Sequence, residues 1–351
     1  MKWLDSCRLA LATTCLVLTL SASALQADET INLPFKAEAG DEYRLTVQRT
    51  EKRLKGDDPI SQVETNAAYD ARIVEKLPEG YVMAWKQTAY DRKVLEDKTG
   101  AEAQKAETQR AISESLRNLE ISFETNAAGV PVRIVGWSEV SKTIAAAFRE
   151  HLKKGLIARL EGPALAAGKT KEEVEAAAQA QVDAVIGALI LRHDERTAVV
   201  LLEEALLVAG VQNQSLPLGK KVDWSAVAPS LLSEQGVSYE SIGALERLDK
   251  ATSEAEITWT NTYNPDQLRA QALDLIKNQL AASKQVPQDK VDEILSTLSK
   301  LEVSRVDTGK ALIGIEDGWT RSVEYVKRVN SRLEPALQEY QEKTVRIVVS
   351  R

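Results

Sequence analysis

The sequence predicts an α+β fold, in which a curved antiparallel β-sheet, half-barrel or sandwich-like, has helical blocks inserted between its strands. Strand-like alternation of apolar and polar residues fills three parts of the chain, and two long segments with helical spacing separate them. Parallel βαβ units would need a regular alternation of strands and helices, which this order lacks. We therefore expect residues 28–351 to form a single α+β domain with helical insertions at about 138–212 and 264–302.

The first strands are expected directly after the N-terminal segment. In "DEYRLTVQRTEKRL", apolar residues fall at every second position over the first half. Residues 68–93 predict a hairpin, in which Pro78-Glu79-Gly80 supplies the turn. Residues 121–134 predict a second hairpin, and the polar segment 101–118 between them is either a surface helix or a mobile connection.

The first helical block begins at Ser138. This serine is a suitable N-cap for a helix that Gly155 ends, and Thr170 with Glu173 forms a capping box for the next helix. Residues 198–210 are apolar nearly all round, so we expect this helix to be buried on more than one side.

The second half of the chain changes again from strands to helices and back. "SYESIGALERLD" and "SEAEITWTNTYN" predict two strands, and Trp259 and Tyr263 share one face of the second. Asn264 as cap and Pro265 as first residue begin a helix, and another helix opens at Pro287. "ALIGIEDGWTRSVEYVKRVN" and "KTVRIVVSR" alternate and predict the closing strands.

Residues 1–27 have the form of a cleavable signal peptide. Positive residues precede a short apolar core, and small residues follow it up to Ala24 and Ala27, the two candidate cleavage sites. The core is too short for a membrane span. We therefore expect an exported protein of the bacterial periplasm.

The positions of the cysteines and the net charge further limit the class of protein and its partners. Cys7 and Cys15 both lie inside the signal segment, so we expect a mature chain without a disulfide. No other stretch approaches about 18 consecutive apolar residues, so the mature form is not expected to span a membrane. A net charge of −7 without a concentrated basic face argues against nucleic acid as a partner.

The sequence offers little metal or cofactor chemistry. The two histidines, His151 and His193, belong to no H-E-x-x-H pattern, and no G-x-S-x-G motif is present. We predict no metal, no cofactor and no catalytic residue, and we favour a protein that is not an enzyme.

One tripeptide does suggest catalysis, because Asp307-Thr308-Gly309 matches the loops of aspartic proteases. That chemistry needs two carboxylates that share a proton. This chain has one such tripeptide, followed by the cation Lys310. We predict a turn instead, in which Asp307 and Thr308 bond local backbone and Gly309 takes a positive φ.

Aromatic residues in or next to the predicted strands are the candidate ligand-binding residues. Core packing is their commoner role, because aromatic side chains bury large areas. The functional alternative is an apolar groove on the concave face of the sheet, lined or plugged by the helix at 198–210. The groove candidates are Trp85, Trp137, Trp259, Trp319 and Tyr263.

Segments 124–137 and 306–319 share a design. Each contains an acidic residue, a threonine, a glycine, an alternating strand and a final Gly-Trp pair. A duplicated half-domain would explain the likeness, and so would two independent hairpins with similar turn chemistry.

Four short features occur in order along the chain. They are Gly40-Asp41-Glu42-Tyr43, a hairpin from Gly129 to Gly136, a loop with Pro217, Gly219 and Trp224, and a late hairpin with Asp307 and Gly309. In these features the chain resembles a family of exported bacterial proteins of unknown function, which brings no catalytic residues. The overall design is also similar in kind to periplasmic lipoprotein carriers, whose curved sheet holds helices and acyl chains.

These observations favour a non-catalytic periplasmic protein. We expect it to bind a lipid or other apolar ligand, or an envelope protein, through the curved sheet and its helices. The alternatives are an envelope hydrolase that uses carboxylates and a helical module for protein interaction.

Overall fold

The computed structural model describes residues 30–351, except for positions 167, 213, 229–235, 284–287 and 334–337. The predicted signal peptide at 1–27 lies outside the described residues, as does Pro287. Within the described part of the chain, no helix is long and apolar enough to cross a membrane.

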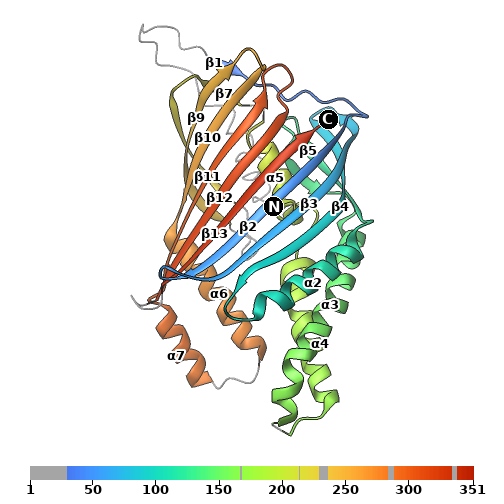
Figure 1. The fold of residues 1–351 in the computed structure, drawn as a ribbon, viewed down its shortest axis with the longest axis vertical. Helices are drawn as coiled ribbons and strands as arrows, with labels where there is room; N and C mark the ends of the chain where they lie inside the picture. Colours follow the sequence, from blue (N-terminus) through green and yellow to red (C-terminus); the bar gives the residue numbers. More distant parts are fainter. Residues whose placement is uncertain (1–29, 167, 213, 229–235, 284–287, 334–337) are drawn as a thin grey trace, which may run out of the picture.

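Eleven antiparallel strands form one large sheet, which confirms the predicted α+β class (Figure 1). The order across the sheet is β6-β5-β4-β3-β2-β13-β12-β11-β10-β9-β8, so the sheet has two edges and does not close into a barrel. The strands are β2 (Glu42–Lys55), β3 (Asp58–Leu77), β4 (Gly80–Asp97), β5 (Glu120–Asn126), β6 (Pro131–Ile134), β8 (Lys221–Ala228), β9 (Val237–Asp249), β10 (Glu254–Tyr263), β11 (Glu302–Gly314), β12 (Thr320–Arg332) and β13 (Gln338–Ser350). A separate two-stranded sheet pairs β1 (Thr30–Asn32) with β7 (Ser215–Pro217).

The helices lie between strands in the sequence, and several of them extend past one end of the sheet in space (Figure 1). One helix separates β4 from β5, a block separates β6 from β7, and a second block separates β10 from β11. The helical elements are α2 (Ala101–Leu116), α3 (Trp137–Ala166), α4 (Lys171–Ile186), a π-helical turn (Gly187–Leu191), a 3₁₀-helix (Thr197–Leu201), α5 (Glu203–Ala209), α6 (Pro265–Ser283) and α7 (Gln288–Leu298).

The strand register places the core on one face of the sheet, which we call the inner face and which also packs α5. Because side chains alternate along a strand, every second residue belongs to this face between the register shifts that interrupt some pairings. Seven neighbouring strands each contribute one apolar residue to a continuous line across the sheet. This apolar row consists of Leu245, Ile257, Ala311, Val323, Ile347, Val47 and Ala67. All seven side chains are buried.

The helix predicted at 198–210 consists of two shorter pieces. The 3₁₀-helix stops before Leu202, whose φ of −93° and ψ of 52° leave the helical region, and α5 starts directly after it. α5 buries Val208 against the inner face. Thr320, a fully buried residue of β12, donates a hydrogen bond of 2.8 Å to the carbonyl oxygen of Val208.

The two Gly-Trp pairs use the same local device. At positions 136–137 and 318–319, a glycine with a positive φ (66° and 68°) precedes a buried tryptophan. Each indole Nε1–H donates to a distant backbone carbonyl, at 2.7 Å for Trp137 and 2.6 Å for Trp319. The following elements differ, because Trp137 begins α3 and Trp319 precedes β12.

The strand β3 begins well before the predicted hairpin, at Asp58 instead of residue 68. Its first half lacks a clear apolar period because the polar residues Ser61 and Thr65 point to the inner face and are buried there. Arg92 of β4 satisfies Thr65 by donating a hydrogen bond of 3.2 Å to its hydroxyl oxygen.

The prediction that Gly155 ends a helix is wrong, because α3 runs through it. Gly155 lies where α3 packs against α2: the Gln104 side chain donates a 3.0 Å hydrogen bond to its carbonyl oxygen. A Cβ at this position would lie 3.4 Å from Thr108 Oγ1, an ordinary van der Waals contact, so the helix contact does not require a glycine. Ser138 is likewise inside α3 and is not its N-cap.

Trp319 is the side chain whose loss should damage the fold most. It is 1% exposed and contacts both Phe35 and Tyr43, at ring-centroid distances of 4.9 and 5.0 Å. We expect Trp319→Ala to lower the free energy of unfolding by about 3–5 kcal/mol in urea titrations. Val348→Ala, on the exposed outer face of β13, should change it by less than about 0.5 kcal/mol. Equal losses for the two variants would contradict this assignment.

Candidate binding site on the inner face of the sheet

The inner face changes from apolar to charged within a few residues along each strand. Two residues along each strand from the apolar row is a second row of in-register residues, which we call the mixed row. It consists of Gly243, Trp259, Gly309, Tyr325, Val345, Arg49, Thr65 and Arg92. One step further lies the charged row, formed by Trp224, Ser241, Asn261, Asp307, Lys327, Lys343 and Glu51. At roughly 3.3 Å per residue, the change is complete within about 13 Å.

Two tryptophans of these rows lie against glycines of neighbouring strands. A Cβ on Gly309 would be 2.0 Å from the Trp259 ring, and a Cβ on Gly243 would be 2.4 Å from the Trp224 ring. Both rings therefore occupy space that only a glycine leaves free. Trp224 and Trp259 are both partly exposed, so this part of the inner face presents aromatic surface.

The turn predicted at Asp307-Thr308-Gly309 is wrong, because these residues lie inside β11. Their cross-strand partners in β10 are Asn261, Thr260 and Trp259. Gly309 is not among the residues with positive φ, so its role is to accommodate the Trp259 ring. The tripeptide thus serves sheet packing.

Asp307 is fully buried and its carboxylate is held by two neighbours. Arg305 donates to both oxygens, at 3.0 Å from Nε to Oδ1 and 2.5 Å from Nη2 to Oδ2. The Tyr325 hydroxyl donates to Oδ2 at 2.5 Å. The Arg305 guanidinium also lies 4.0 Å from the centre of the Tyr263 ring and donates to its hydroxyl at 3.1 Å.

Burial and charge keep the two tyrosines of this cluster protonated and Arg305 charged. Burial, and then the negative charge of Asp307, raise the pKa of Tyr263 and of Tyr325, so both phenols stay protonated. Burial opposes the charge of Arg305, but its hydrogen bonds and ion pair with Asp307 outweigh this and raise its pKa. A carboxylate engaged in this way is unsuited to share a proton with a second acid, which argues against a protease role for Asp307.

The start of α5 brings two glutamates to the charged part of the inner face. Glu203 is 2.5 Å from the Nζ of Lys343 and 3.7 Å from Arg49, and Glu204 forms an ion pair with Arg49. Burial opposes the ionisation of Glu203, but the charges of Lys343 and Arg49 outweigh burial and lower its pKa. Ion pairs therefore fix the N-terminal end of α5, and apolar packing fixes the rest.

Lys327 differs from its neighbours, because its ammonium has no hydrogen bond or ion pair with any described residue. It is partly buried between Asp307 of β11 and Lys343 of β13, its two in-register partners. Burial, and then the positive charge of Arg305, lower its pKa, and Lys343 adds to this effect. Asp307 and Glu203 act in the opposite direction; the effect of Asp307 is smaller than that of Arg305 but larger than that of Lys343.

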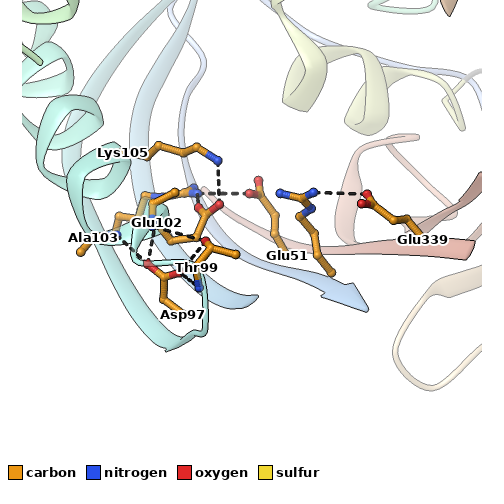
Figure 2. Close-up of polar contacts among 10 residues, drawn as sticks. Glu51, Asp97, Thr99, Glu102, Ala103, Lys105 and Glu339 are labelled. Atoms are coloured by element: carbon orange, nitrogen blue, oxygen red, sulfur yellow. Dashed lines mark hydrogen bonds and ion pairs between the residues drawn. The ribbon is translucent and has the colours of Figure 1, made fainter. Parts of the chain in front are cut away.

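A second network of ion pairs links β2, β4 and α2 (Figure 2). Arg92 reaches Glu51 at 3.3 Å and Glu102 of α2 at 3.7 Å, and Lys105 reaches Glu102 at 2.7 Å. Asp97 caps α2 by accepting a hydrogen bond of 2.7 Å from the Glu102 backbone N–H. Between α2 and β4 lies an open pocket of about 580 Å³, to which Arg92 contributes.

The structure divides the predicted groove residues among three places. Trp85 and Trp319 both pack against Tyr43 and border a void of only about 10 Å³, too small for more than one water. Trp259 and Tyr263 lie together on the inner face of β10, next to the charged cluster. Trp137 is apart from both groups, at the start of α3.

Charged residues of the site were missed by the sequence analysis, although a signal was present. In "VEYVKRVN", Lys327 has the same parity as Val323 and Tyr325, and Lys343 precedes Val345 by two residues. A lysine that continues an apolar face of a strand is the pattern to look for. Among the described residues, no group of three or more His, Cys, Asp or Glu is placed to hold a metal ion.

No protein-family model and no curated protein matches this chain. Among solved structures, the chain is similar to one titled "Lipid-protein interactions in lipovitellin", with a TM-score of 0.42 and 9% sequence identity. The match covers 90% of this chain and 25% of that one, so the present chain spans about a quarter of its length. A score at this level describes a loose likeness of architecture and carries no functional argument.

The contact between Trp259 and Gly309 can be tested by a paired substitution. We expect Gly309→Ala to lower the free energy of unfolding by about 1–3 kcal/mol, because the new methyl group overlaps the indole. The loss should shrink by more than half when Trp259→Ala is already present. Urea titrations of the four proteins measure both values, and an unchanged loss in the Trp259→Ala background would contradict the contact.

The buried pair of Arg305 and Asp307 gives a second test. Asp307→Asn leaves a largely buried guanidinium without its charge partner and should cost about 3–5 kcal/mol of stability. Replacing both residues, as in Arg305→Met with Asp307→Leu, should cost less than Asp307→Asn alone. Thermal and chemical unfolding give the comparison. If the double variant were less stable than Asp307→Asn, the ion pair would stabilise the fold by more than each residue's neutralisation of the other's buried charge.

Proposed function

We propose that this protein is a non-catalytic binding protein that takes up an amphipathic ligand on the inner face of its open sheet. The observation that carries this proposal is the side-by-side arrangement of partly exposed tryptophans and partly buried charges on one sheet face. Such a face offers contacts to an apolar chain and to a polar head in neighbouring positions.

The apolar part of the ligand would lie over Trp224 and Trp259. Both rings lie against glycines of neighbouring strands and are partly exposed, which leaves aromatic surface near the β8 edge. Aromatic surfaces of this kind bind acyl chains and other apolar groups at a low cost in side-chain entropy, because few torsions have to be fixed.

The polar part would lie at the charged row. Trp259 is on β10 and Lys327 is on β12, so a single strand separates them. Two strand spacings correspond to about 10 Å. An amphiphile of ordinary length spans this distance.

The buried chemistry supports binding over catalysis. The most deeply buried acid of the site, Asp307, is held by Arg305 and Tyr325, and Glu203 and Glu204 are held by Lys343 and Arg49. The pKa of Glu203 is lowered, whereas a general acid at neutral pH needs a raised pKa. We further propose that residues 1–27 direct the chain to the periplasm, where such a protein would meet envelope lipids.

Native mass spectrometry of the protein purified from the periplasm tests the proposal directly. We expect a bound mass in addition to the polypeptide, and saturable binding of palmitate below its micellar concentration after delipidation. Trp259→Ala should weaken palmitate binding about tenfold, equivalent to about 1.4 kcal/mol. Ile242→Ala, an exposed residue of β9 on the outer face, is the matched control and should leave binding unchanged. A wild-type protein with neither a bound mass nor palmitate binding would overturn the proposal.

A further inference from the structure

We infer that Lys327, with Lys343 and Arg305 beside it, is the contact for an anionic head group of the ligand. This inference rests on the proposed function and names the ligand class more closely: an amphiphile whose head carries a negative charge, such as a carboxylate. It follows from the pairing of charges on the inner face, taken residue by residue.

The sheet register places two lysines directly opposite each other. Lys327 of β12 and Lys343 of β13 are in-register partners on the same face. Like charges in this position destabilise an antiparallel pair, so a sheet without a ligand requirement would be expected to avoid them. Asp307 of β11 is the other in-register partner of Lys327. Arg305 lies two residues before Asp307 and adds a third cation nearby.

Every carboxylate near Lys327 is already engaged elsewhere. Asp307 is directly opposite Lys327 across β11 and β12, but both its oxygens accept hydrogen bonds from Arg305, and Oδ2 also accepts one from Tyr325. Glu203 is bound to Lys343 at 2.5 Å. The charge that would neutralise Lys327 therefore has to come from outside the described residues.

The environment of Lys327 favours an added anion. Its side chain is partly buried, so water screens its charge poorly, and Arg305 and Lys343 add positive potential that Asp307 and Glu203 offset in part. Hydrogen bonds between an ammonium and an ionised oxygen are about twice as strong as neutral ones. A head group at this point would relieve the repulsion between the lysines, and its chain would extend across β11 toward Trp259.

Other cations on the inner face are less suited to this role. Arg49 and Arg92 each contact at least one glutamate, although the Nε atoms of both are buried without a hydrogen-bond partner among the described residues. Arg53 is paired with Glu339 at 3.3 Å. Lys327 is thus the position at which a bound anion would replace no existing ion pair.

The test compares ligands that differ only in head-group charge. Wild-type protein, delipidated, is titrated with palmitate and with methyl palmitate, and separately with acetate and inorganic phosphate as heads without a chain. We expect palmitate to bind at least tenfold more tightly than its ester. Lys327→Met should remove this preference by weakening palmitate and leaving the ester unchanged. Lys327→Arg should retain most of the preference.

A matched lysine variant controls for the loss of charge. Lys310 lies on β11 but on the outer face, where it is 2.9 Å from Glu256. Lys310→Met should leave the preference for palmitate intact. Thermal unfolding of Lys327→Met should show a midpoint no lower than that of the wild type, because the variant removes one of two opposed like charges. If Lys327→Met instead had a folding defect, its affinities for palmitate and for the ester would fall together. Lys327→Arg, which keeps the charge, would then test the head-group contact.

The outcomes separate the two proposals. Equal affinity of the wild type for palmitate and its ester would overturn the head-group assignment and leave the proposed function standing. Equal weakening of both ligands by a Lys327→Met protein that unfolds at the wild-type temperature would also overturn it. Tight binding of acetate or phosphate without a chain would show a site for free anions, and would contradict the inference that the ligand is an amphiphile. Failure of the wild type to bind either palmitate or the ester would defeat the proposed function, and this inference with it.

Discussion

The register of the eleven-stranded sheet is the constraint on which the rest of the structure depends. Because side chains alternate along each strand, a slip of one residue in any pairing would turn that strand's apolar residues outward. The register instead brings Val47, Ile347 and Val323 into line, and two residues further along the same strands it aligns Arg49, Val345 and Tyr325. The core, the position of α5 and the boundary of the charged region all follow from this alignment.

The charged half of the inner face shows how the fold accommodates buried ionised groups. Isolated charges of this kind are costly, and pairing offsets the cost only where the geometry is complete. Arg305 and Asp307 form such a pair with two tyrosines around it, and the glutamates of α5 are matched by Arg49 and Lys343. α5 therefore depends on the sheet at both ends, through ion pairs at Glu203 and through the hydrogen bond of Thr320 to Val208.

Alternation along the sequence was sufficient to predict the antiparallel sheet, the β9–β10 pair and the helical blocks between strands. It was not sufficient where polar residues face inward. The start of β3 was missed because Ser61 and Thr65 are buried on the inner face. The tripeptide at 307–309 was taken for a turn because aspartate and glycine are typical of turns, whereas an arginine two residues away and a tryptophan on the next strand explain both residues. Only tertiary contacts supply that information.

The candidate site was predictable in part. Trp259 and Tyr263 were expected to share a face and do so, whereas nothing local in the sequence could show that Trp85 and Trp319 meet around Tyr43. Lys327 could have been recognised by its parity with Tyr325, but the lack of a partner could not, because that depends on where the oxygens of Asp307 and Glu203 point.

An open sheet has a further consequence at its two borders, where unpaired backbone groups invite a strand from another molecule. The two edge strands, β6 and β8, hinder the addition of such a strand by different means. β6 is short, begins with Pro131, which has no N–H to offer, and its Ile134 N–H is already bonded to the carbonyl oxygen of Glu195 at 2.7 Å. β8 is longer and instead carries the exposed charges of Lys221 and Asp223. Conditions that neutralise those charges would therefore promote chain-to-chain strand addition at β8 before β6.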